Sequence, residues 1–399
     1  MVPRPEQGLP RVELATDDVP RGPWVFARNV LPAGIHGVRD GDLVEVVDAS
    51  GRFLGHALYN GTSDIRLRWL SRGRKTELRR PRDFLLRRLR AADRLRRKVL
   101  RIDEVSDAYR VAHAEGDDLP GLVVDRLAGT LVAEYHALGF WRLREDVEWA
   151  LGELYPGFPV VHRVPRSALR AEGFDPALAD SLEPGAEVEI VEHGLRFPVV
   201  PGAGHKTGWF CDQRDNRRRI AELAGGRRLL DLCCNAGGFS LHAARAGARR
   251  VVAVDLDEVA LERAARAAEL NGLPVETVHQ DAFDHLRALR EANAHFELVV
   301  LDPHKLIPGR AQMETGLRKY GDLNALALER VAPGGLMATF SCSGALDLPA
   351  FLGVVFAAAR RARRELRLIE LLEAGPDHPQ RPDFGRSRYL KGALLALDA

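Results

Sequence analysis

The chain has 399 residues, enough for two or three domains, and its 46% apolar, 7% aromatic and 29% charged content is typical of a folded globular protein. No apolar run approaches the roughly 20 residues of a membrane span, and the N-terminus lacks the apolar stretch of a signal peptide. Four cysteines, two of them adjacent, form neither a disulfide framework nor a CxxC metal pair, and the 13 histidines lack ligand spacing. We therefore expect a cytoplasmic protein with no metal site and no membrane partner.

The net charge of +2 is unevenly distributed along the chain. Residues 66–101 hold 16 Lys and Arg against three acidic residues, a net charge of +13, so the rest of the chain sums to −11. A solvated helix face is the simplest explanation, but such density also suits binding to a polyanion. We therefore expect Arg87, Arg90 and Arg94 to bind a polyanion such as a nucleic acid. Lysine is rare, with six Lys among the 58 basic residues, which suggests that some of the positions with Lys206, Lys305, Lys319 and Lys391 do not accept Arg.

The first half of the chain predicts a β-rich module followed by a basic helix and a mixed region. Residues 22–72 alternate short β-like runs with turns such as DASG and NGTS. Residues 84–101 have the period of an amphipathic helix. Its expected apolar stripe consists of Leu85, Leu89, Ala92 and Val99. Residues 103–200 contain strand-like runs and the helical pattern WRLREDVEWALGELY, which indicates an α+β domain.

From residue 201 onward strands and helices alternate, which predicts a doubly wound α/β domain with a mainly parallel sheet. Its last two strands are close in sequence, so we expect an antiparallel pairing at the end. The expected segments are a flexible N-terminus at 1–20, a β-rich module at 21–75, a basic helical linker at 76–102, an α+β middle domain at 103–200 and the α/β domain at 201–399.

A glycine turn follows the first strand of this domain, in LLDLCCNAGGFS. Asn235 and Gly237 lie where backbone amides can face a ligand, although a tight turn without ligand is the alternative. The turn lacks the GxGxxG and P-loop phosphate signatures. Asp255 ends the next strand about 20 residues later, where an acid suits ribose hydroxyls. Asp281 follows a third strand and suits an adenine amino group or a helix N-cap. A nucleoside cofactor without pyrophosphate, S-adenosylmethionine, fits this pattern best.

Two further strand ends, in LDPHK and FSCSG, carry Asp302 and Cys342. Adjacent strand ends of a doubly wound sheet meet beside the cofactor crevice, so both side chains are expected to face one substrate. A thiolate that adds to carbon-6 of cytosine makes carbon-5 nucleophilic, and a carboxyl group assists at ring N3. The alternative is that Cys342 is a small buried apolar residue, but the flanking Ser341 and Ser343 argue against full burial.

The segment GHKTGWFCDQRDNRRR precedes the glycine turn by about 20 residues and is expected to form a lid. Gln213 and Arg214 are candidates for cofactor binding, with Arg214 gripping a carboxylate in bidentate fashion. Lys206 is a candidate for binding RNA phosphate. An ordinary capped helix start is the competing interpretation.

Taken together, these motifs resemble the class I S-adenosylmethionine-dependent methyltransferases that modify cytosine-5 of large-subunit (23S) ribosomal RNA, of the large-subunit methyltransferase I type. PWVFARNV with GDLVEVVDASG resembles the N-terminal PUA module of that family, and HAEGDDLPGLVVDR its middle domain. The resemblance implies a Rossmann-like C-terminal domain, ribosomal RNA as substrate, and self-association into a homodimer. It also implies that Cys342 is the attacking thiol. The resemblance also implies that five residues line the cofactor site: Asp231, Asn235, Asp255, Asp281 and Asp302.

The chain departs from the Asp-Pro-Pro-Lys pattern of the family at one position, since it has Asp302-Pro303-His304-Lys305. A second proline would stiffen this loop, whereas His304 leaves the backbone less constrained. His304 and Lys305 are expected on the RNA side, and the base that removes the carbon-5 proton stays open. Two other functions stay open as well: methylation of a base nitrogen such as a guanine amino group, and an inactive cofactor- and RNA-binding homologue.

Overall fold

The computed structural model describes residues 9–15, 21–31, 37–73, 78 and 80–398. The chain forms two compact units. Unit 1 comprises Met1–Val188, Val199–Phe210 and Pro376–Ser387, and unit 2 comprises Glu189–Pro198, Cys211–Gly375 and Arg388–Ala399. In the described ranges no helix is both long and apolar enough to cross a membrane.

Unit 1 begins with a five-stranded sheet in the order β1-β3-β4-β5-β2. Its strands are β1 (Arg11–Glu13), β2 (Trp24–Phe26), β3 (Leu43–Val47), β4 (Phe53–Tyr59) and β5 (Ile65–Arg72). Apolar side chains such as Val44, Val46 and Leu67 close its core, which confirms the expected β-rich module. Strand β1 pairs parallel with β3, although we had expected it to lie in a flexible segment. Of that expected segment, residues 1–8 and 16–20 lie outside the described residues.

The basic helix is α1 (Pro81–Arg94), which continues into a π-helical turn at Leu95–Val99. Leu85, Leu89 and Ala92 are buried, as the period predicts. The expectation for Val99 is wrong, because this side chain is 64% exposed. The π-turn adds a residue to the helical turn and shifts the phase of the stripe. The fully buried position falls instead on Arg96, whose guanidinium makes a bidentate ion pair with Asp117 at 2.6 and 2.7 Å.

A four-stranded sheet in the order β6-β7-β8-β9 completes unit 1, together with four short helices. The strands are β6 (Ala108–His113), β7 (Leu122–Leu127), β8 (Thr130–Tyr135) and β9 (Val160–Arg163). The helices are α2 (Leu138–Arg142), α3 (Arg144–Leu154), α4 (Arg166–Glu172) and α5 (Leu178–Ser181). Phe140 and Val147 from these helices share one core with α1 and the sheet. The α+β expectation for this region is confirmed.

Two segments from the expected α/β domain, 199–210 and 376–387, belong to unit 1. Thr207 Oγ1 donates to Asp125 Oδ2 at 2.5 Å. The carbonyl of Asp377 accepts from Arg96 Nη2 at 2.6 Å, and its carboxylate accepts from the backbone N–H of Arg110 at 3.0 Å. Because these segments are joined to the rest of unit 1 by polar contacts, the periodicity of apolar residues does not predict that they belong there.

Unit 2 contains all but the outer end residues of the hairpin β10 (Val188–Glu192) and β11 (Leu195–Val199). It also contains a seven-stranded sheet in the order β14-β13-β12-β15-β16-β18-β17. The first five strands of that order are parallel, and β18 is antiparallel to both of its neighbours. The strands are β12 (Arg228–Leu232), β13 (Arg250–Asp255), β14 (Glu276–His279), β15 (Phe296–Leu301), β16 (Val331–Ser341), β17 (Leu366–Leu372) and β18 (Lys391–Leu397). The predicted mainly parallel sheet with an antiparallel end is therefore confirmed.

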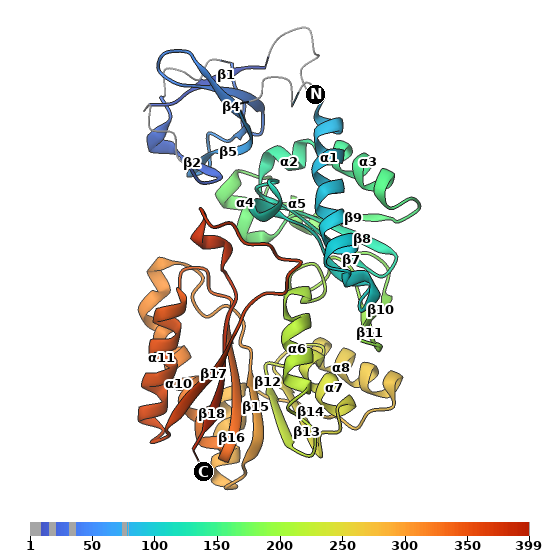
Figure 1. Ribbon diagram of the computed structural model, residues 1–399, viewed down its shortest axis with the longest axis vertical. Helices are drawn as coiled ribbons and strands as arrows, with labels where there is room; N and C mark the ends of the chain where they lie inside the picture. The colour runs from blue at the N-terminus through green and yellow to red at the C-terminus, as the bar shows by residue number, and fades with distance from the viewer. Residues whose placement is uncertain (1–8, 16–20, 32–36, 74–77, 79, 399) are drawn as a thin grey trace. The chain divides into compact units, whose positions relative to one another are not determined.

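Helices cover both faces of this sheet, as Figure 1 shows. They are α6 (Arg214–Ala221), α7 (Gly238–Arg245), α8 (Glu258–Asn271), α9 (Ala282–Glu291), α10 (Met313–Arg330) and α11 (Leu348–Arg361). Leu230 and Leu232 of β12 pack toward α9, α10 and α11, and Leu229 packs toward α6 and α7. Because strand side chains alternate, β12 contributes to both cores, and the last residues of the five parallel strands project at one edge.

Candidate active site

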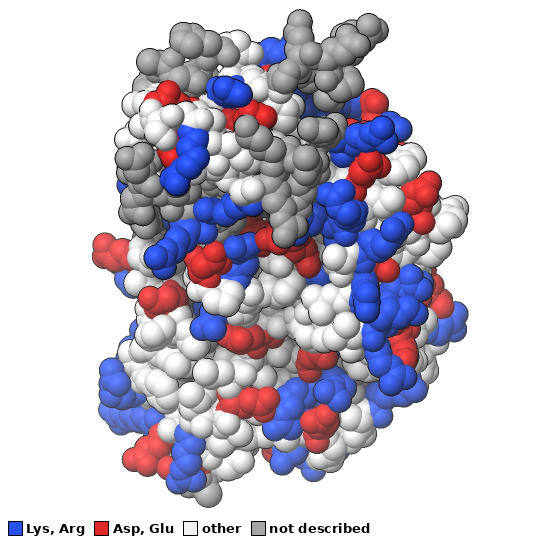
Figure 2. All heavy atoms as spheres, turned by 45° about the horizontal axis from the view of Figure 1, so that its top comes forward, with Lys and Arg blue, Asp and Glu red and all other residues white. Residues whose placement is uncertain are grey.

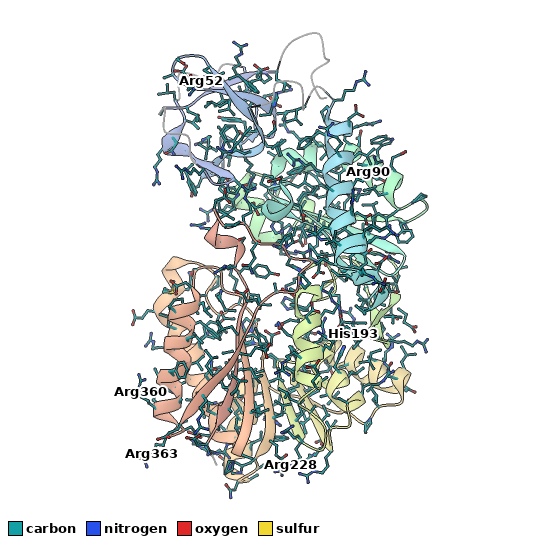
Figure 3. All side chains as sticks on the ribbon, in the orientation of Figure 1. Arg52, Arg90, His193, Arg228, Arg360 and Arg363 are labelled. Carbon is teal, nitrogen blue, oxygen red and sulfur yellow. The ribbon has the colours of Figure 1, made fainter. Side chains whose placement is uncertain are left out.

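The sequence-predicted site residues of unit 2 gather at the carboxyl edge of the parallel strands. Arg228 marks the amino end of β12 in Figure 3, so the opposite edge carries the site. There the neighbouring strands β13, β12, β15 and β16 end beside one another. Their ends carry Asp255, Asp231, Asp302 and Cys342 respectively. An open parallel sheet binds its ligands at this edge.

Asp231 is fully buried near the end of β12. Its Oδ2 accepts from the backbone N–H of Ser240 at 3.1 Å and from the Ser240 hydroxyl at 2.6 Å. Its Oδ1 has no hydrogen-bond partner among the residues that the structure describes. Burial raises the pKa of Asp231 to about 7, and the neighbouring carboxylates of Asp302 and Asp255 add to the rise, while Ser240 opposes it. Such an orphaned buried oxygen calls for a donor or a positive charge from a ligand.

The glycine turn adopts the left-handed conformations that its sequence predicts. Asn235 has φ of 48°, and Gly237 has φ of 75° at the N-cap of α7. A Cβ on Gly237 would lie 2.8 Å from Leu241 Cδ1 and 3.0 Å from Ala264 Cβ, so only glycine lets α7 and α8 approach here. The turn thus leaves backbone groups next to Asp231 without a side chain in the way.

Asp255 fixes the turn on the next strand. Its Oδ2 accepts from the backbone N–H of Asn235 at 2.8 Å, and its Oδ1 accepts from that of Asp257 at 2.9 Å. The carboxylate is half-buried, so it is held rigidly while one side stays open to a ligand. Asp281 caps α9 through Oδ1, which accepts from Phe283 N at 2.8 Å. The N-cap alternative is therefore observed, and an adenine contact of Asp281 stays a prediction.

Gln213 contacts Asp302, a pairing that the sequence did not indicate. Its Nε2 donates to Asp302 Oδ2 at 2.9 Å, and its Oε1 accepts from Asn216 Nδ2 at 2.6 Å. Asn216 also donates to the carbonyl of Glu373 at 3.0 Å, so the chain of hydrogen bonds is anchored to backbone. Gln213 therefore orients the carboxylate of Asp302. Arg214 is buried and donates to Asp215 Oδ2 at 2.9 Å, and its expected grip on a cofactor carboxylate stays a prediction.

Cys342 follows β16 directly and is half-buried against a cluster that includes Phe340 and Leu390. Cys342 is not fully buried, as expected, but the flanking Ser341 and Ser343 are, so their polarity does not indicate exposure here. The Ser341 hydroxyl donates to Tyr320 OH at 2.9 Å, and the Ser343 hydroxyl lies 3.1 Å from the same phenol. Hydrogen bonding on both sides thus fixes the backbone around the half-buried thiol.

Lys391 is the residue of this site to which the sequence assigned no role. It is buried at the start of β18, and its Nζ donates to the carbonyls of Ser343 at 2.8 Å and Tyr389 at 2.6 Å. Burial lowers the pKa of Lys391 to about 8, with Lys305 adding to the fall, whereas Cys342 and Asp347 oppose it. The scarcity of lysine in this chain was the signal that could have identified it.

The predicted RNA-binding residues His304, Lys305 and Lys206 lie in loops. His304 and Lys305 are exposed in the loop after Asp302, as expected for residues that face a large substrate. Lys206 belongs to unit 1, where its Nζ lies 4.5 Å from the centre of the Phe210 ring. The described part of the chain holds no cluster of His, Cys, Asp and Glu that would bind a metal ion.

The basic residues of α1 also belong to unit 1. Arg87, Arg90 and Arg94 are exposed on one face of the helix, and Figure 3 labels Arg90 there. In Figure 2 Lys and Arg side chains gather on the right-hand side of the view, with Asp and Glu side chains among them.

Comparison with known proteins agrees with this architecture. A family model described as an S-adenosylmethionine-dependent methyltransferase matches residues 171–395, and a PUA-like domain model matches residues 20–72. The chain belongs to the family of S-adenosylmethionine-dependent methyltransferases. The buried, unpaired Oδ1 of Asp231 beside the glycine turn and the held carboxylate of Asp255 fit a cationic nucleoside of this kind.

Within that family, the chain is similar to curated proteins named ribosomal RNA large subunit methyltransferase I. The protein of Aeromonas salmonicida is 36% identical over 382 residues, which cover 94% of this chain and 95% of the relative. That of Photobacterium profundum is 36% identical over 377 residues, covering 93% and 94%. The fold also matches a solved structure of a candidate methyltransferase from Streptococcus mutans, with a TM-score of 0.80, 18% identity, and coverage of 97% of this chain and 99% of the other.

Proposed function

We propose that this enzyme transfers a methyl group from S-adenosylmethionine to carbon-5 of a cytosine in large-subunit (23S) ribosomal RNA, through a covalent adduct of Cys342. The names of the curated relatives support ribosomal RNA of the large subunit as the substrate. The observation that carries the chemistry is the half-buried thiol of Cys342 at the strand end next to that of Asp302. A thiol and a carboxyl group at adjacent strand ends suit attack on a pyrimidine ring.

S-adenosylmethionine, when bound, supplies an electrophilic methyl group on a sulfonium centre. The residues we assign to its binding are Asp231, Asn235, Gly237, Asp255, Asp281, Gln213 and Arg214. Asp255 is placed to accept from ribose hydroxyls. The unpaired Oδ1 of Asp231 offers a negative or hydrogen-bonding partner that no described side chain uses.

In the proposed reaction the Cys342 thiolate forms a bond to carbon-6 of the cytosine, and the ring electrons move toward carbon-5 and N3. Asp302, oriented by Gln213, protonates or hydrogen-bonds N3 as charge develops there. Carbon-5 is then nucleophilic and accepts the methyl group. Removal of the carbon-5 proton and loss of the thiolate restore the aromatic ring and release Cys342. The base for this last proton is not assigned; His304 is a candidate by its place in the loop.

The RNA-binding role is assigned to the PUA-like module and to Arg87, Arg90 and Arg94 of α1. It is also assigned to Lys206 of unit 1 and to His304 and Lys305, which follow β15 in unit 2. A cytosine has to leave its stack for a thiol to reach carbon-6, so unpaired RNA is the expected substrate. The functional boundaries at 20/21, 75/76, 102/103 and 200/201, a homodimer and a cytoplasmic location stay predictions.

The test combines a methyl-labelled cofactor with 23S ribosomal RNA and measures labelled nucleosides after digestion. We expect labelled 5-methylcytidine from the wild type and a loss on the order of a thousandfold or more in Cys342→Ala, because the covalent step has no substitute. Cys211→Ala, at a buried cysteine without an assigned role, is the matched control and keeps its activity. Cofactor binding by calorimetry shows that each variant retains its fold.

Other outcomes would replace the proposal. Normal methylation by Cys342→Ala would remove the thiol from the mechanism, and labelled methylguanosine would indicate a base-nitrogen methyltransferase. Tight cofactor binding without any RNA methylation, together with activity gained in His304→Pro, would indicate an inactive homologue. The exposed position of His304, in place of a stiffening proline, is the observation that motivates this variant.

A further inference from the structure

The turn that presents Cys342 is held by a buried cation. Lys391 is 3% exposed, and two of its three N–H groups donate to the carbonyls of Ser343 and Tyr389. It lies opposite Ser341 in the antiparallel pairing of β16 with β18, so its position is fixed by sheet register. A lysine ammonium is rarely buried without a charged partner.

The ammonium of Lys391 lies beside the backbone that carries Cys342, because it donates to the carbonyl of the next residue, Ser343, at 2.8 Å. The charged or titratable groups that influence Lys391 are Cys342 and Asp347, which favour its ammonium form, and Lys305, which opposes it. Asp347 already accepts from the backbone N–H of Ala350 at the N-cap of α11. Burial raises the pKa of Tyr320, and Cys342 adds to the rise, so Tyr320 is a neutral phenol. It is hydrogen-bonded to Ser341 and Ser343 and carries no positive charge.

We propose that Lys391 is a positioning residue whose buried ammonium fixes the turn Ser341–Ser343 and stabilises the thiolate form of Cys342. This inference deepens the proposed function, since it assigns the source of thiolate at neutral pH. A free thiol with an ordinary pKa of about 8.5 is only a few per cent ionised at pH 7. A neighbouring cation increases that fraction. An arginine has a planar guanidinium rather than a compact ammonium, so it is not equivalent to lysine at a buried site of this kind.

The test measures the alkylation rate of Cys342 by iodoacetamide between pH 5.5 and 10, with the labelled peptide resolved by mass spectrometry. It follows the thiol directly and requires neither RNA nor methyl transfer. In the wild type we expect the rate to reach half its maximum below pH 8. In Lys391→Met we expect a rate at pH 7 about tenfold lower, which corresponds to a shift of one unit, and the same limiting rate at high pH. Lys391→Arg keeps the charge and is expected between the two.

Lys319→Met, at an exposed lysine of α10, is the control and leaves the profile unchanged. An identical pH profile in Lys391→Met and the wild type would overturn the proposal, even if methylation fell. If Lys391→Met does not fold, the wild type still decides, because a half-maximum at or above pH 8.5 would also overturn it. Failure of the proposed function looks different, since Cys342→Ala would then methylate RNA normally whatever the alkylation profile shows.

Discussion

At the scale of single residues, Asp231 carries a carboxylate that the fold keeps close to protonation at neutral pH. Burial raises its pKa from 3.8 to about 7, with Asp302 and Asp255 as further causes. The folded protein therefore binds a proton between roughly pH 4 and 7 that the unfolded chain releases. Stability from this group is present at low pH and is lost as the pH rises through about 7.

Asp231→Asn should remove this dependence, because an amide does not titrate. We expect the free energy of unfolding of Asp231→Asn to rise relative to the wild type by about 2 kcal/mol between pH 5 and 7. Urea unfolding of both proteins without cofactor at pH 5, 6 and 7 measures the difference. Asp284→Asn, at an exposed acid, is the control. If the free energies of unfolding of Asp231→Asn and the wild type differ by the same amount at each pH, the pKa of Asp231 is not raised.

At the scale of elements, α1 presents Arg87, Arg90 and Arg94 on its exposed face. If these residues contact RNA phosphates, each contact releases counterions, and the logarithm of the affinity falls linearly with that of the salt concentration. We expect the triple Gln variant to reduce the magnitude of this slope by roughly two, at about 0.7 for each phosphate on single-stranded RNA. Filter binding of a ribosomal RNA fragment at several salt concentrations measures it.

The matched control for α1 neutralises Arg360 and Arg363 at the end of α11, which are exposed and labelled in Figure 3. This variant loses positive charge in unit 2 and should keep the wild-type slope. Equal slopes for the α1 variant and the wild type would remove α1 from the RNA-binding surface. The helix would then be a solvated face with one buried stripe, as its period alone allows.

At the scale of the whole molecule, the sequence predicts the elements and the edge that carries the site. Apolar runs that end at Asp255, Asp302 and Cys342 define the strand ends, because the carboxyl edge of a parallel sheet follows from alternation of strands and helices alone. The resemblance to a family adds the PUA-like module and the cofactor. Short sequence patterns thus suffice to predict the helices, the strands and the sheet edge at which the strands end.

What the sequence does not predict depends on contacts between distant residues. Lys391 is hydrogen-bonded to Ser343, which is 48 residues away in the sequence, and Gln213 is hydrogen-bonded to Asp302, which is 89 residues away. Val99 is exposed because a π-turn changes the helical phase, which a fixed period does not anticipate. The segment with Asp377 packs in unit 1 through polar groups rather than through an apolar stripe.

The most direct measurement of the central claim, a covalent bond from Cys342 to the cytosine ring, uses 23S ribosomal RNA transcribed with 5-fluorocytidine. Fluorine replaces the carbon-5 proton whose removal precedes loss of the thiolate, so the adduct accumulates. With S-adenosylmethionine present, we predict a protein–RNA complex that survives denaturation and whose cross-linked peptide contains Cys342. The mechanism would be contradicted if wild-type protein that methylates unmodified RNA formed no such complex. It would also be contradicted if Cys342→Ala formed the complex in undiminished amount.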